Sequence, residues 1–302
     1  MKKFRFVISL ITSDNDYQIE QASAASAVAP RLAVDVEIIF ADNDPIKQSQ
    51  QLLTMIQMVP ASRPDAILME PAGGTALPVV ARAAAAAKIG WVVLNRQADY
   101  VCELRRGSKA PVFAVSADHV EIGRIQGRQL ATLLPKGGTA VYMQGPSASP
   151  VSQQRSIGMH ETKPDNVTLK VLKSANWTEG SGYQAASAWL RLSTSHKDPI
   201  DLVVCQNDFI AMGAKKAFRE HISSDERKEH PEPRFTGVDG MPRTGQDCVK
   251  RGLLAATIIV PAVTVPALEL LVAAMRMGSP VPESSLIEPA SYPDLAQIAA
   301  KS

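Results

Sequence analysis

Short apolar runs alternate along this chain with longer segments that carry apolar side chains at helical spacing. The short runs predict buried strands at residues 4–11, 34–40, 65–69, 91–94, 112–115, 138–144, 169–174, 202–205, 235–238 and 255–259. The longer segments predict helices at residues 17–29, 45–58, 77–88, 118–134, 151–161, 181–192, 210–220, 242–251 and 266–277. Such repeated strand-helix alternation at short spacing predicts an α/β fold of parallel sheets with right-handed crossovers.

The chain has 302 residues, which is longer than a domain with a single hydrophobic core usually is, so two domains are expected. Two similar α/β lobes, each with its own sheet, are the simplest packing of the predicted elements. The charged, proline-bearing stretch at residues 223–233 interrupts the second series, and we expect it to be a solvated loop.

Three of the predicted strands end on polar clusters. Asn95-Arg96-Gln97 follows one strand, Gln206-Asn207-Asp208 follows another, and Asp239-Gly240 follows a third. In an open parallel sheet, ligands bind in the crevice at the carboxyl ends of the strands. These ends carry amides, a guanidinium and carboxylates, but no evident pair of nucleophile and base. The pattern therefore indicates a protein that holds a polar molecule and does not break it.

Several of these residues also have a purely structural interpretation. Asp208 directly precedes a predicted helix and is expected to cap its amino end, which leaves Asn207 as the better ligand contact. Asp239 before Gly240 is compatible with simple turn chemistry. Arg96 is harder to explain structurally, because an unpaired charge after a buried strand would be costly. Trp177 lies in a polar segment, where a core role and a binding role both stay open.

Composition excludes several classes of function. A net charge of +2 with dispersed basic residues argues against a nucleic-acid partner. The three cysteines, Cys102, Cys205 and Cys248, have no pattern typical of disulfides or zinc, and the five histidines lack metal-ligand spacing. Phosphate-binding glycine loops and hydrolase motifs are missing from the sequence. We therefore expect no metal, no cofactor and no enzymatic activity.

The amino end leaves two alternatives for localisation. Met1-Lys2-Lys3 resembles the start of a signal peptide, but residues 4–10 run into a polar segment without a small-residue cleavage site. The segment is better interpreted as a first buried strand. We expect a periplasmic protein if a leader has been removed, and a cytoplasmic one if Met1 is the native start. No apolar run approaches the ~20 residues of a membrane span.

Four segments together carry a resemblance to a known family. Residues 94–97 (LNRQ), 206–208 (QND), 237–240 (GVDG) and 252–258 (GLLAATI) occur in this order at family-like intervals. They resemble the type I periplasmic sugar-binding proteins, especially the ribose-binding branch, and the related effector domains of LacI-type repressors. The resemblance covers nearly the whole chain. It implies two Rossmann-like lobes joined by a three-crossover hinge, with residues 1–117 plus 261–288 in one lobe and 118–260 plus 289–302 in the other.

The resemblance also implies a set of ligand-binding residues. First-loop contacts fall on Asn15 and Tyr17, the arginine of the second lobe on Arg155, and the aromatic that covers the far face of the sugar on Trp177. The set is completed by Asn95, Arg96, Asn207 and Asp239. Its chemistry suits a sugar, because aromatic rings supply apolar area for the ring faces while guanidinium, amide and carboxylate groups bind the hydroxyls.

Departures from the ribose-binding pattern point to another ligand. The chain has Tyr17-Gln18 in place of two aromatics, Val238 before Asp239, and Val260 in place of a glutamine. A strand-end carboxylate of the family is Asn95 here.

With Arg96 and Arg155 set against Asp239 alone, the pocket is expected to carry excess positive charge. These features give the hypothesis of a ligand other than ribose, such as a sugar acid or an acidic polyol.

The favoured function is a monomeric solute-binding protein that captures a sugar, polyol or sugar acid by hinge closure and delivers it to an ABC importer, without entering the membrane itself. The alternative is a cytoplasmic LacI-like ligand sensor that lacks a DNA-binding module and signals through a partner protein. An α/β enzyme is a third and more distant possibility, because no catalytic pair can be named.

Overall fold

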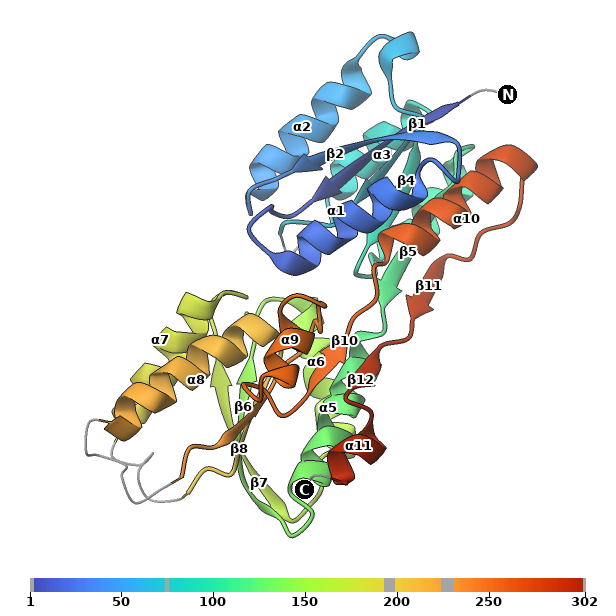
Figure 1. Cartoon of the computed structure of the whole chain (residues 1–302). Helices are drawn as coiled ribbons and strands as arrows, with labels where there is room; N and C mark the ends of the chain where they lie inside the picture. The colour runs from blue at the N-terminus through green and yellow to red at the C-terminus, as the bar shows by residue number, and fades with distance from the viewer. Residues whose placement is uncertain (1–2, 74–75, 193–198, 224–230, 301–302) are drawn as a thin grey trace. The chain divides into compact units, whose positions relative to one another are not determined.

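The chain folds into two compact α/β units (Figure 1). The computed structural model describes residues 3–73, 76–192, 199–223 and 231–300. Unit 1 comprises Met1–Ala117 and Pro261–Ile287, and unit 2 comprises Asp118–Val260 and Glu288–Ser302. The chain therefore passes from one unit to the other three times.

Unit 1 is built on a parallel sheet of six strands among its described residues, in the order β11-β5-β4-β3-β1-β2. Its strands are β1 (Phe4–Leu10), β2 (Val34–Phe40), β3 (Ala66–Met69), β4 (Gly90–Leu94), β5 (Val112–Ala117) and β11 (Ser284–Ile287). Its helices are α1 (Asp16–Val28), α2 (Pro45–Gln57), the 3₁₀ turn η1 (Pro60–Ser62), α3 (Pro78–Ala86), α4 (Tyr100–Gly107) and α10 (Thr264–Met277).

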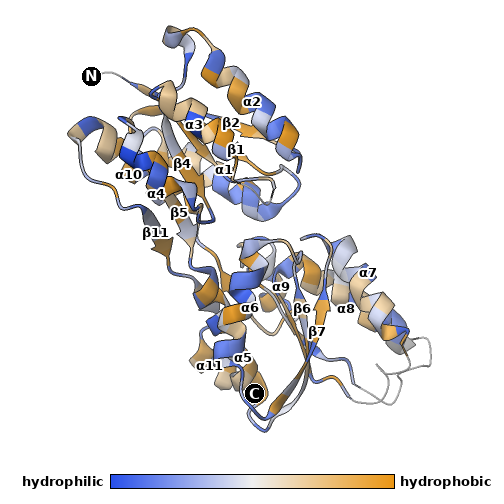
Figure 2. Ribbon diagram, turned by 180° about the vertical axis from the view of Figure 1, so that it is seen from behind, coloured by the Kyte–Doolittle hydropathy of each residue, from blue (hydrophilic) through white to orange (hydrophobic). Residues whose placement is uncertain are grey.

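Alternation along β1 builds two cores, one on each face of this sheet. Phe6, Ile8 and Leu10 point to the face that α1 and α10 cover, where they pack against residues of both helices. Val7 points to the other face and packs with residues of α2, α3 and α4. Helix α2 is correspondingly amphipathic, with hydrophobic and hydrophilic stretches visible along it (Figure 2).

Unit 2 repeats this plan on a smaller parallel sheet of four strands among its described residues, in the order β7-β6-β8-β9. A separate antiparallel pair joins β10 to β12. The strands are β6 (Gly138–Gln144), β7 (Val167–Lys173), β8 (Leu202–Cys205), β9 (Arg234–Thr236), β10 (Thr257–Ile259) and β12 (Ala290–Tyr292). The helices are α5 (His119–Leu133), α6 (Pro150–Thr162), α7 (Glu179–Leu190), α8 (Asp208–Ser223), α9 (Gly245–Lys250) and α11 (Leu295–Ala299).

Helices α5 and α6 approach so closely that their contact requires glycine. A Cβ atom added to Gly123 of α5 would lie 2.0 Å from the carbonyl oxygen of Arg155 in α6. A Cβ added to Gly158 of α6 would lie 1.9 Å from the carbonyl oxygen of Val120 in α5. The backbone of α6 is therefore held directly against α5 at Arg155 and one turn further along the helix.

The sequence-based elements agree with the structure except at short or polar segments. The helix expected at 242–251 is confined to Gly245–Lys250, and the strand expected at 255–259 to Thr257–Ile259. Four elements, α4, β11, β12 and α11, were not predicted, because they are too short or too polar for a clear hydrophobic period. Most of the expected loop at 223–233 lies outside the described residues.

A buried carboxylate, Asp208, ties together three segments of unit 2. Its Oδ2 accepts a hydrogen bond from the backbone N–H of Gly240 at 2.8 Å, and its Oδ1 bonds the hydroxyl of Thr257 at 2.7 Å. A Cβ on Gly237 or Gly245 would lie 2.0 or 2.1 Å from its oxygens, so the surrounding chain closes tightly on the group. This burial, and then the charge of Asp239, raise the pKa of Asp208 well above its ordinary value.

The α5–α6 contact predicts the effect of a single methyl group. Gly158→Ala is expected to lower the free energy of unfolding by about 1–3 kcal/mol, because backbone atoms of α5 occupy the required space. Gly180→Ala in α7 is the matched control, since nothing lies within 4 Å of its added Cβ and alanine favours the helix. Urea denaturation of both variants checks the prediction. Equal effects of the two substitutions would show that the helices can move apart without cost.

The raised pKa of Asp208 predicts a pH dependence of stability. Because the folded protein holds this proton more tightly than the unfolded chain, its contribution is present at low pH and is lost as pH rises through the folded pKa. Asp208→Asn removes the titration and can still accept from Gly240 and donate to Thr257. The unfolding free energy of D208N relative to wild type should therefore increase as urea titrations move from pH 4 toward pH 8, by at most ~1.4 kcal/mol per pH unit. A relative gain by wild type over this range would contradict the assignment.

Candidate ligand-binding site

The amino end of α1 carries the two first-loop residues of the predicted site. Asn15 caps the helix, since its Oδ1 accepts from the backbone N–H groups of Tyr17 at 2.9 Å and Gln18 at 3.3 Å. Tyr17 is buried in the first turn. The structure therefore gives Asn15 a clear local role as a cap, which fixes the start of α1 at the carboxyl end of β1.

Asn95 and Arg96, at the carboxyl end of β4, converge on the carboxylate of Glu70. Asn95 Nδ2 donates to Glu70 Oε1 at 2.9 Å, and Gln18 Nε2 donates to Glu70 Oε2 at 2.9 Å. The guanidinium of Arg96 donates from Nη1 to the carbonyl oxygen of Gly73 at 2.7 Å and attracts the Glu70 charge. Burial raises the pKa of Glu70, while these two hydrogen bonds and Arg96 oppose the shift.

Glu70 is a candidate site residue that was not predicted from the sequence. It follows the buried strand β3 directly, so the rule applied to Asn95 and Asp239 would also have found it. We expected Asp239 alone to balance the positive charges of Arg96 and Arg155. The presence of Glu70 beside Arg96 shows that this expectation is wrong. Arg96 faces a carboxylate of its own in unit 1, and burial lowers its pKa while Glu70 raises it.

In unit 2, two of the predicted residues, Asp239 and Trp177, lie near the guanidinium of Arg155. Its Nη2 lies 3.9 Å from Asp239 Oδ1, its Cζ lies 5.6 Å from the centre of the Trp177 ring, and Nη1 donates to the carbonyl oxygen of Gln206. The Trp177 ring packs over Gly145, where an added Cβ would come within 2.2 Å of it. The half-buried ring is therefore held at the carboxyl end of β6.

Asn207 has the capping role that was expected of Asp208. Its Oδ1 accepts from the backbone N–H of Ile210 at 2.8 Å, and its Nδ2 donates to the carbonyl oxygen of Trp177 at 3.0 Å. The prediction that Asp208 caps this helix is wrong, because Asp208 is the first residue of α8 and its carboxylate turns toward Gly240. Asn207 thereby connects the amino end of α8 to the loop that carries the aromatic ring.

Two of the predicted site residues have left-handed backbone conformations. Asn95 has φ of 57° and Asp239 has φ of 104°. Residues other than glycine rarely adopt such values, and those that do gather at functional sites. Asp239 is fixed from both sides, since its N–H donates to the carbonyl oxygen of Ile258 at 3.1 Å and its own carbonyl oxygen accepts from Val260. In each case, a turn with positive φ at the end of a strand sets the direction of the side chain.

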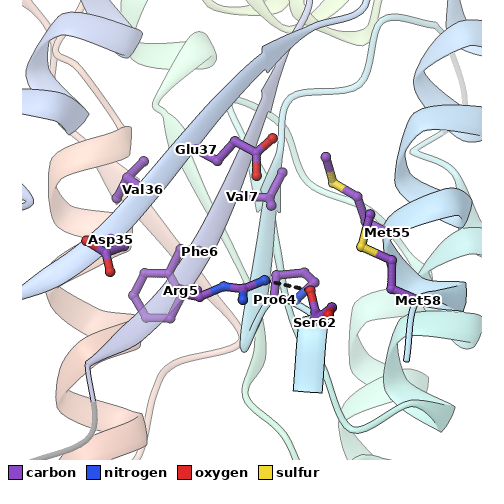
Figure 3. A pocket seen from close by; sticks show the side chains of 10 residues that line it. All are labelled: Arg5, Phe6, Val7, Asp35, Val36, Glu37, Met55, Met58, Ser62 and Pro64. Atoms are coloured by element: carbon purple, nitrogen blue, oxygen red, sulfur yellow. Dashed lines mark hydrogen bonds between the residues drawn. The ribbon is translucent and has the colours of Figure 1, made fainter. Parts of the chain in front are cut away.

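Two pockets lie elsewhere on the units and contain none of the predicted residues. One, of about 210 Å³, is lined by segments near the amino ends of β1 and β2, and in it Arg5 donates to the carbonyl oxygen of Ser62 (Figure 3). The other, of about 430 Å³, lies in unit 2 around Lys215, Phe235 and Leu254. Because ligands of parallel sheets bind at carboxyl strand ends, the polar clusters are the better candidate.

Among residues 3–73, 76–192, 199–223 and 231–300, no group of three or more His, Cys, Asp or Glu side chains is arranged to hold a metal ion. No helix within these ranges has both the length and the apolar character needed to cross a membrane.

The chain is similar in sequence to several import binding proteins. The chain is 28% identical over 260 residues to the D-apiose import binding protein of Paraburkholderia graminis, covering 85% of this chain and 76% of that protein. It is 26% identical over 261 residues to the ribose import binding protein RbsB of Salmonella typhimurium, covering 85% and 79%.

Solved structures share the fold at low identity. A periplasmic solute-binding protein of an Actinobacillus succinogenes ABC transporter, with bound D-allose, aligns at a TM-score of 0.82 with 21% identity, covering 99% of this chain and all of that one. The myo-inositol binding protein of Caulobacter aligns at a TM-score of 0.79 with 20% identity, covering 99% and 97%. Residues 6–276 match the periplasmic binding protein domain family, and the chain therefore belongs to this family, with its type I sugar-binding members as relatives.

Proposed function

We propose that this protein captures a neutral sugar or cyclic polyol and delivers it to an ABC importer. The proposal rests on one observation. Each unit has a cluster of polar side chains at the carboxyl ends of its strands, and each cluster contains an arginine and a carboxylate. Unit 1 supplies Asn95, Arg96 and Glu70, and unit 2 supplies Arg155 and the groups around it. Each cluster supplies polar groups that bind ligand hydroxyls in this proposal.

The balance of charge favours a neutral ligand. Arg96 is matched by Glu70 in unit 1, and Arg155 by Asp239 in unit 2. The remaining buried carboxylate, Asp208, is engaged by Gly240 and Thr257. An anionic ligand would need an uncompensated guanidinium in order to repay its desolvation. The proposed ligand is therefore an uncharged polyhydroxylated ring. The earlier hypothesis of a sugar acid is tested by including an acidic analogue in the titration described below.

The aromatic ring of Trp177 provides the apolar part of the recognition. A sugar ring has apolar faces, and a rigid indole face buries them at low conformational cost. The polar groups then discriminate between epimers, because a hydroxyl in the wrong position leaves a buried donor or acceptor unpaired at a cost of ~1–3 kcal/mol.

The names of the relatives support transport over sensing. The D-apiose and ribose proteins are import binding proteins, and the structural neighbours include solute-binding proteins of ABC transporters. We therefore infer a monomer that works with an importer in the periplasm, and prefer this to the cytoplasmic sensor. Binding without chemical conversion is the activity of such a protein.

Calorimetric titration tests the class of ligand. D-ribose, D-allose, D-apiose and myo-inositol would be titrated beside D-ribonate as the acidic analogue. We expect at least one neutral compound to bind at least about tenfold more tightly than D-ribonate, which corresponds to ~1.4 kcal/mol. Tighter binding of the acid would contradict the charge argument, and binding of none of these compounds would refute the proposed class.

Substitution of Arg155 tests the unit 2 cluster. Arg155→Met should weaken binding of the neutral compound that wild type holds best by about tenfold or more, because a charge-assisted donor is lost. Arg219→Met is the matched control, since Arg219 is exposed and pairs with Glu232 away from the cluster. Thermal melting of both variants verifies folding. Unchanged affinity of a folded R155M would remove Arg155 from the site.

A further inference from the structure

The side-chain amide of Gln48, near the start of α2, is fully buried and has hydrogen-bond partners at both ends. Its Nε2 donates to the carbonyl oxygen of Glu70 at 2.8 Å and to the hydroxyl of Ser9 at 3.0 Å. Its Oε1 accepts from the backbone N–H of Ala72 at 2.9 Å. The amide therefore connects helix α2 with strand β1 and with the turn that follows β3.

These backbone partners fix the orientation of the Gln48 amide. A carbonyl oxygen only accepts and a backbone N–H only donates, so Nε2 must face Glu70 and Oε1 must face Ala72. Half a turn of the amide would set acceptor against acceptor at Glu70 and donor against donor at Ala72. Gln48 therefore holds two backbone groups of the turn in a fixed relation to α2.

Helix α2 supports the same turn at a second point. The side chain of Asp44 caps the helix and so fixes where it starts. The ring of Pro45, the next residue, lies against Gly73, where an added Cβ would come within 3.0 Å of Pro45 Cβ. Residues 70–73 are thus held by hydrogen bonds from Gln48 and by this contact at Gly73.

The turn at residues 70–73 in turn holds the guanidinium of Arg96. The Nη1 of Arg96 donates to the carbonyl oxygen of Gly73 at 2.7 Å. The charge of Glu70 also acts on this guanidinium. Both of these groups belong to the turn, so the position of Arg96 depends on the path that the backbone takes from residue 70 to residue 73.

We propose that Gln48 is a positioning residue for the ligand-binding site, which fixes the turn at residues 70–73 and, through it, the guanidinium of Arg96. This inference rests on the proposed function, since Arg96 is one of the donors that bind ligand hydroxyls there. A guanidinium presents its donors in a rigid planar fork, so a small displacement moves all of them away from their acceptors. Gln48 acts through the turn, because its own amide is already engaged by the protein.

Two substitutions of Gln48 and one control isolate this role. Gln48→Met keeps the length of the side chain but removes every hydrogen bond of the amide. Gln48→Glu is milder, because a carboxylate still accepts from Ala72 but cannot donate to the carbonyl oxygen of Glu70. Gln51→Met is the matched control, since Gln51 lies on the same helix and donates to the carbonyl oxygen of Phe40 at 3.2 Å, away from the turn.

Calorimetry with D-ribose, D-allose, D-apiose and myo-inositol tests the effect on binding. For the compound that wild type holds best, Q48M should bind about tenfold more weakly, because a displaced Arg96 loses a charge-assisted hydrogen bond. Q48E should bind more weakly in the same direction, and Q51M should keep the affinity of wild type. Thermal melting shows which variants are folded.

Equal losses in Q48M and Q51M would overturn the proposal, since the effect would then come from α2 in general. If Q48M does not fold, Q48E carries the test, and a folded Q48E with the affinity of wild type would overturn the proposal.

A ligand-free measurement separates this inference from the proposed function. The Nε–H group of Arg96 is buried, so its NMR signal is protected from exchange with water, and its absence in Arg96→Lys assigns it. The signal should shift in Q48M and Q48E and stay in place in Q51M. An unmoved signal in both Gln48 variants would overturn the positioning role. A shifted signal without binding of any of the four compounds would support that role and refute only the proposed class of ligand.

Discussion

Burying a carboxylate at the end of a parallel strand is the constraint on which both clusters of the candidate site depend. A buried carboxylate must have its oxygens hydrogen-bonded, since leaving them without partners costs several kcal/mol. Glu70 meets this requirement with two side-chain amides, and Asp208 meets it with a backbone N–H and a hydroxyl. Each carboxylate therefore fixes segments that are far apart in the sequence.

The fold supplies the same kind of support to Arg155 by another means. Glycines in α5 and α6 bring the two backbones into direct contact at this residue and one turn after it, so helix packing positions its guanidinium. Gln206 then completes the support, since its amide bonds Gly145, Ser152 and Tyr142 and its carbonyl oxygen accepts from Arg155. Helix packing and buried hydrogen bonds therefore hold Arg155 in place.

The sequence predicted the architecture well because strand and helix periods are local properties. The strand ends at Asn95 and Asp239 could be recognised from a single apolar run followed by polar residues. Glu70 follows the same pattern, yet its role depends on Gln18 and Asn95, which the fold brings together from separate turns. The exchange of roles between Asn207 and Asp208 is a shift of one residue in a helix boundary, which is below the resolution of pattern analysis.

The carboxylates also set the balance of charge in the candidate site. Each guanidinium has a carboxylate of its own, so in the proposed function neither cluster offers an uncompensated charge for discrimination between ligands. An amide, by contrast, presents a donor or an acceptor in nearly the same shape. A mismatch at such a group would leave a buried polar atom unpaired without changing the volume of the site. In the proposed function, discrimination between hydroxyl patterns therefore falls to the amides and not to net charge.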